Sequence, residues 1–173
     1  MITKAEIINQ PYYGQFQERI YDISSPWNSQ NWTWVKFEED RNEWCGQFRG
    51  SPRAVALSRK YHKVLVLTSD YLFQVDCDSG ECTEYESSPQ YQSLTVTPVG
   101  DFIIADDYSI EKIESTLKDK ILLESPIKMD GIKFHGWSNN QLLITCDEFL
   151  NWENHVQLEL DGDTFEIKIK NQK

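Results

Sequence analysis

The sequence predicts an all-β protein made of antiparallel four-stranded meander repeats of about 39 residues, arranged as a small β-propeller or as a rolled sheet or barrel. The equivalent apolar residues Leu57, Val96 and Phe134 stand 39 and 38 residues apart, close to the roughly 40–50 residues of a propeller-blade repeat. Short runs rich in β-branched and aromatic residues alternate with turn residues, which is typical of strands. Convincing helical periodicity is missing.

Residues 1–53 are interpreted as a degenerate first unit of this repeat. Turn clusters at 11–14 and 24–26 flank a possible strand at 19–23. The segment 32–37 has the β-branched and aromatic content of a strand, and 43–49 returns as its partner after a polar turn. Terminal repeats are commonly atypical because they cap an array.

Three clear units follow, at 54–90, 91–128 and 129–173, within one domain that spans 1–173. The second strand of each unit is nearly all apolar, as in strands buried on both faces, and the later strands alternate. The segment 108–120 stays open between a strand and a short helix, because Ile110, Ile113 and Leu117 also fit a helical spacing. The expected strands are 55–57, 64–68, 71–75 and 82–85; 94–96, 102–105, 109–113 and 121–123; and 132–134, 141–145, 155–160 and 164–169.

The net charge of the chain indicates which kinds of partner it can bind. The chain of 173 residues has a net charge of -11 and a pI of about 4.7. Such a surface repels phosphate, so direct nucleic-acid binding is not expected, whereas a basic protein would be steered toward it. The same acidity also serves solubility alone. No secretory signal and no apolar run of about 18 residues is visible, so we expect a cytoplasmic protein without membrane contact.

The sequence offers no motif for catalysis, metal or cofactor. The four cysteines, at 45, 77, 82 and 146, contain no C-x-x-C pair and are expected as reduced thiols, although Cys77 and Cys82 flank a turn. The run GWSNN at 136–140 lacks the second glycine of a nucleophile elbow. The acidic turn at 76–81 lacks the twelfth-position glutamate of a calcium loop, where Ser87 stands. We therefore expect no enzyme, no metal and no cofactor.

The candidate site is a repeated pairing of acids with an aromatic ring, after the second strand of each unit. Equivalent loops of stacked units lie on one rim, so this pattern predicts an acidic, aromatic rim for a basic protein. Aspartate is also common in tight turns, which leaves a purely structural role open. The residues are Asp70 and Tyr71; Asp106, Asp107 and Tyr108; and Asp147, Glu148 and Phe149.

The third clear unit carries an insertion. Ile113 and Leu158 stand 45 residues apart, against 38 for Val75 and Ile113. The extra segment, 149–155, is expected as a loop with Trp152 beside Glu153. Long loops of repeat proteins tend to mark the binding face, so both residues join the candidate site. Alternatively, Trp152 folds back onto the core.

Three runs, WCGQFRGSP at 44–52, VLTSDY at 66–71 and PVGDF at 98–102, together resemble small bacterial immunity proteins that protect against secreted or contact-delivered toxins. The resemblance spans about residues 40–165. It implies a compact, acidic, cytosolic inhibitor that covers the active site of a basic toxin domain, such as an RNA-cleaving nuclease, as a monomer or in a 1:1 complex. The alternative is a lectin-like domain that binds carbohydrate or small molecules on its tryptophans.

Overall fold

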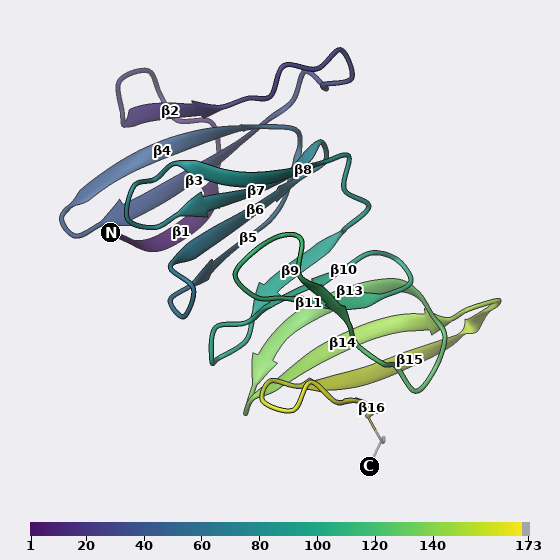
Figure 1. Ribbon diagram of the computed structural model, residues 1–173. Helices are drawn as coiled ribbons and strands as arrows, with labels where there is room; N and C mark the ends of the chain where they lie inside the picture. The colour runs from purple at the N-terminus through teal and green to yellow at the C-terminus, as the bar shows by residue number, and fades with distance from the viewer. Residues whose placement is uncertain (171–173) are drawn as a thin grey trace. The chain divides into compact units, whose positions relative to one another are not determined.

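The computed structural model describes residues 1–170, and every regular element in that range is a β-strand, sixteen in all. The strands form four sheets of four strands each (Figure 1). The chain divides into two compact units, Met1–Pro89 and the part from Gln90 onward, and each unit holds two of the sheets. The prediction of an all-β fold made of four-stranded sheets is therefore confirmed.

The first sheet differs from a meander. Its strands are β1 (Ile2–Ile8), β2 (Gln17–Tyr21), β3 (Trp32–Glu39) and β4 (Asn42–Arg49). They lie in the order β1-β3-β4-β2, and β2 runs parallel to β4. The strand expected at 19–23 starts and ends two residues earlier, and β1 was not expected. Because β1 lies at the sheet edge and fully buries only Ile2, its sequence has little apolar alternation.

The second sheet is the predicted antiparallel meander. It contains β5 (Pro52–Ser58), β6 (Lys63–Thr68), β7 (Tyr71–Asp76) and β8 (Cys82–Ser87) in sequence order. The β7–β8 turn is fixed by Asp76, whose carboxylate accepts hydrogen bonds from the Ser79 N–H and hydroxyl, each at 3.0 Å. Gly80 follows with φ of 70°, a conformation that glycine adopts without strain.

The core of the first unit lies between its two sheets and is rich in aromatic rings. Phe48 stacks on Tyr21 with ring centroids 4.3 Å apart and meets Phe73 edge-on at 5.3 Å. Gly46 makes this packing possible, because a Cβ there would come within 2.6 Å of the Phe48 ring. The cluster also includes Val35, Phe37, Trp44, Val64, Val66 and Val75.

The second unit contains two further meanders. The first has β9 (Ser93–Val96), β10 (Phe102–Ala105), β11 (Ile110–Ile113) and β12 (Lys120–Leu122); the second has β13 (Met129–Ser138), β14 (Gln141–Glu148), β15 (Asn151–Asp161) and β16 (Ile167–Ile169). Ile110 and Ile113 lie opposite Ala105 and Phe102, so this part of the segment 108–120 is a strand. Residues 114–119, which include Leu117, form a turn and not a helix. The core between these sheets includes Ile103, Ile110, Met129, Leu142, Ile144 and Leu158.

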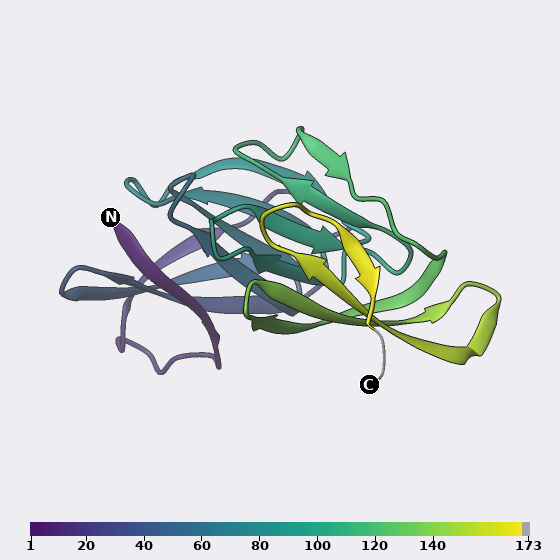
Figure 2. The ribbon, with the colours of Figure 1, turned by 90° about the horizontal axis from the view of Figure 1, so that it is seen from below.

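The segment 149–155 is not the loop that the insertion predicted. β14 and β15 continue as a hairpin that projects beyond β16 (Figure 2), with a tight turn at Leu150, whose φ is 66°. The register changes from Asp147 opposite His155 to Glu148 opposite Asn151, so residues 152–154 bulge out of the ladder. Asp147 and Glu148 accordingly lie in β14 and not in a loop.

All four cysteines are free thiols, as expected. Cys82 lies opposite Val75 and not opposite Cys77, so the two thiols do not face each other across the strands. Burial raises the pKa of Cys45, Cys77 and Cys146 to about 11, which keeps these thiols protonated and unreactive near neutral pH. Among the described residues, none forms a helix long and apolar enough to cross a membrane.

Candidate functional site: an apolar groove in the second unit

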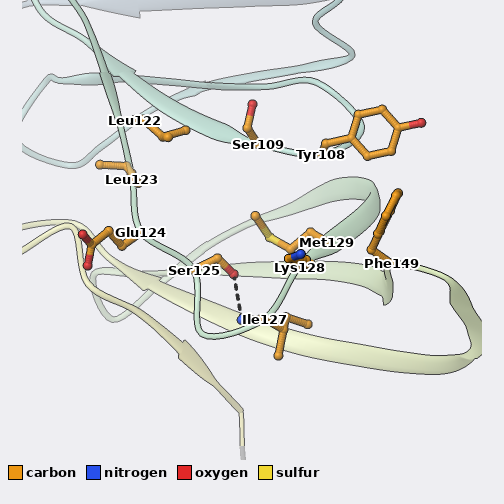
Figure 3. A pocket seen from close by; sticks show the side chains of 10 residues that line it. All are labelled: Tyr108, Ser109, Leu122, Leu123, Glu124, Ser125, Ile127, Lys128, Met129 and Phe149. Carbon is orange, nitrogen blue, oxygen red and sulfur yellow. Dashed lines mark hydrogen bonds between the residues drawn. The ribbon is translucent and has the colours of Figure 1, made fainter.

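An apolar cavity of about 710 Å³ opens on the second unit and is here called the Tyr108–Phe149 groove. Its volume lies within the roughly 300–1,000 Å³ of typical ligand sites. Figure 3 shows Tyr108 and Phe149 on one side, with Leu122, Leu123 and Glu124 across from them. The lining residues are Tyr108, Ser109, Leu122, Leu123, Glu124, Ser125, Ile127, Lys128, Met129 and Phe149.

The groove combines a buried floor with exposed aromatic walls. Leu123 and Met129 are buried and belong to the core of the unit. Tyr108 and Phe149 remain 59% and 41% exposed, and their rings meet edge to face with centroids 6.0 Å apart. This is a favoured geometry for an aromatic pair. Large apolar side chains that stay exposed beside a cavity are typical of a binding surface.

The Asp106 carboxylate fixes the turn that presents Tyr108. It accepts hydrogen bonds from the backbone N–H groups of Tyr108 at 2.8 Å and Ser109 at 2.7 Å. Asp106 therefore has the purely structural role in a tight turn that the sequence left open. The neighbouring Asp107 is exposed. Phe149 is held from the other side, because its N–H donates to the Lys128 carbonyl at 2.9 Å.

The linker from β12 to β13 forms the rest of the wall. The Leu123 N–H donates to the Ile110 carbonyl at 2.9 Å, which extends the β11–β12 pairing by one residue. The chain then turns at Ser125, whose hydroxyl accepts a hydrogen bond from the Ile127 N–H at 3.4 Å (Figure 3). Glu124 and Lys128 are the charged residues of the lining, and both are exposed.

The acids of the projecting hairpin are held by neighbours on the same hairpin. Glu148 accepts hydrogen bonds from the side-chain amides of Asn154 at 2.9 Å and Asn151 at 3.1 Å, and these bonds lower the pKa of Glu148. Asp147 pairs with the His155 ring. Both carboxylates therefore order the hairpin that carries Phe149.

Trp152 does not fold onto the core. It is 67% exposed, and its indole N–H donates to the Asp130 carboxylate at 3.2 Å. The adjacent Glu153 is exposed as well. The bulge thus presents an aromatic ring and an acid on the same hairpin as Phe149, while neither residue lines the groove.

Asp70 and Tyr71, in the first unit, serve that unit internally. Tyr71 is buried in its core, and its hydroxyl donates a hydrogen bond to the Asn28 side chain. The Asp70 carboxylate accepts a hydrogen bond from the Ser29 N–H at 2.7 Å. The two residues hold the 25–29 loop against the second sheet instead of presenting a free surface.

Of the predicted site, the structure brings Tyr108 and Phe149 together. The aliphatic half of the groove, which is formed by Leu122, Leu123, Ile127 and Met129, was not predicted from the sequence. A signal existed, because the sequence ILLESPIKM at 121–129 places apolar residues on both sides of a short polar turn. Within residues 1–170, no group of three or more His, Cys, Asp or Glu side chains is placed to hold a metal ion.

No family model and no curated protein sequence matches the chain significantly. Similar solved structures include the N-terminal domain of Nup159, with 12% identity and a TM-score of 0.47 over 71% of this chain and 34% of that one. A luciferin-regenerating enzyme has 14% identity and a TM-score of 0.45 over 82% and 54%. The WD40 domain of SCAP from fission yeast has 14% identity and a TM-score of 0.43 over 99% and 48%.

The chain thus spans between about a third and about a half of the length of these proteins. Likeness at this level assigns neither a family nor an activity. The class of this protein is therefore defined by its own fold and groove: it is an all-β protein of four-stranded sheets with an apolar, aromatic-walled cavity in the second unit.

Proposed function

We propose that the protein is an interaction module that binds a basic protein partner through the Tyr108–Phe149 groove. The observation that carries this proposal is the exposed aromatic pair at the mouth of a 710 Å³ apolar cavity. Aromatic side chains in a pocket contribute much of the binding energy in protein interfaces, so the pair is suited to hold an apolar anchor of the partner.

Charge supports a basic partner. Asp107 and Glu153 are exposed acids close in sequence to the two groove aromatics, Glu124 lines the groove, and the whole chain carries a charge of -11. The single cation of the lining is Lys128. Complementary charge raises the rate of encounter, whereas the buried anchor determines how long the complex lasts.

Binding is tested by selecting peptides from a random display library on the immobilised protein. We expect the selected peptides to combine Lys or Arg with an aromatic or aliphatic residue. Their association rate is expected to fall with added salt, since steering is screened over about 8–10 Å at physiological ionic strength. Asp107→Lys should slow association severalfold. The matched control is Asp163→Lys, an exposed acid in the turn at the opposite end of β15.

Selected peptides that are acidic, or whose association is unaffected by both salt and Asp107→Lys, would contradict the basic partner. The carbohydrate-binding alternative would be favoured if the protein bound glycans on an array and selected no peptides, and if the Trp152→Ala variant no longer bound those glycans.

We further propose that the partner is a toxin domain, such as an RNA-cleaving nuclease, which the protein neutralises by 1:1 binding. The resemblance of segments 44–52, 66–71 and 98–102 to immunity proteins and the acidity of the chain support this. A nuclease that binds RNA needs a basic surface, which an acidic protein can cover.

Co-expression tests the toxin proposal. The domain encoded next to the gene of this chain is expected to arrest growth when expressed alone and to be tolerated when this protein is present. A neighbouring product without toxicity, or toxicity that this protein does not relieve, would overturn the toxin proposal and leave peptide binding by the groove as a separate result.

A further inference from the structure

β12 is the outermost strand of its sheet and borders the Tyr108–Phe149 groove. It pairs with β11 along one side, and the sheet order places no described strand on the other side. Its apolar residues Ile121 and Leu122 are 50% and 64% exposed. Native proteins usually protect an open edge with charge, proline or a covering segment, because it can pair with another chain.

The register determines which backbone groups of β12 face outward. In an antiparallel pair, successive residues alternate between hydrogen-bonding to the partner and pointing away from it. Leu123 donates to the Ile110 carbonyl, so Leu122 directs its own N–H and C=O away from β11, toward the open edge. Leu122 also lines the groove. An edge donor and acceptor therefore lie beside an apolar cavity.

We propose that the basic partner binds as an extended segment that adds a strand to the edge of β12, with backbone hydrogen bonds to Leu122 and an apolar side chain in the groove. This inference rests on the proposed function and specifies its geometry. Strand addition obtains affinity from the main chain and specificity from pockets for alternate side chains. The side chains that alternate with this anchor point to the solvent side of the segment, and these supply its Lys and Arg residues.

Two alternately N-methylated versions of one library-selected peptide test this geometry. In a strand, alternate N–H groups point to opposite edges. One version therefore blocks the edge that pairs with β12, and the other blocks only the edge that faces solvent. We expect the first to bind about tenfold or more weakly and the second to stay within about threefold of the unmodified peptide. Equal losses, or no loss in either version, would overturn strand addition.

A protein variant tests the same contact from the other side. Leu122→Pro removes the outward N–H, and proline is tolerated where a strand's N–H faces solvent. Leu122→Ala shortens the same side chain but keeps the N–H. We expect Leu122→Pro to bind the peptide about tenfold more weakly than Leu122→Ala does. Equal affinities in the two folded variants would contradict the inference, and the methylated peptides decide the question if the proline variant unfolds.

The two levels of the proposal fail in different ways. Peptide binding that depends on Tyr108 and Phe149 but ignores both backbone tests would leave the proposed function standing and remove strand addition. The absence of any peptide whose binding depends on the groove would remove the proposed function, and strand addition with it.

Discussion

Replacing Tyr108 and Phe149 together by alanine is expected to weaken the binding of selected peptides by about 100-fold or more. Each ring is exposed, yet each forms part of the groove wall, and truncating an aromatic anchor commonly costs about 2 kcal/mol or more. Two such losses correspond to roughly 4 kcal/mol, where each 1.4 kcal/mol is about a factor of ten. Because the two rings contact each other, the two single variants are expected not to add exactly.

Equilibrium titration of a fluorescent peptide measures this effect, with Tyr13→Ala as the control. Tyr13 is an aromatic residue that is fully exposed in the first unit. The double variant should keep its thermal stability to within a few degrees, because neither ring belongs to a core cluster. A loss of less than about threefold would rule out the groove as the main peptide site.

Phe48→Ala is expected to destabilise the first unit by about 3–5 kcal/mol, the usual cost of removing a buried phenylalanine. Phe48 is fully buried and contacts the rings of Tyr21 and Phe73, so its removal opens a cavity where the two sheets meet. Gly46 lies against the same ring but is too small to fill the space.

Urea unfolding followed by tryptophan fluorescence measures the change in the free energy of unfolding. The matched control is Ile20→Ala, on β2 of the same sheet, because Ile20 is largely exposed and its loss is expected to cost less than about 0.5 kcal/mol. A cost below about 1 kcal/mol for Phe48→Ala would contradict the central position given to this ring.

The meanders were predictable because their pairing is local. The apolar runs at 64–68 and 102–105 are the buried strands β6 and β10, and each pairs with its neighbours in sequence. The first sheet was only partly predictable. Its edge strands carry weak apolar patterns. In addition, β2 pairs in parallel with β4 although β3 comes between them in the sequence, and local periodicity does not reveal such a pairing.

The candidate site illustrates why a repeated motif need not have a repeated role. Tyr71 is the first residue of β7, and the register of that strand turns its ring into the core beside Phe73. Tyr108 lies two residues before β11, in a turn that Asp106 holds, and its ring stays outside. An acid followed by an aromatic residue looks the same in both places, and only the strand boundary distinguishes them.

The mixed order of the first sheet has a consequence for how the chain folds. The other three sheets assemble from hairpins that are adjacent in sequence, each needing only a short loop to close. The first sheet must bring β1 across to β3 and lay β2 alongside β4, so more of the chain has to be ordered before those contacts form. Non-local pairing of this kind slows folding. We therefore expect β1 and β2 to pair with the rest of their sheet after the three meanders have formed.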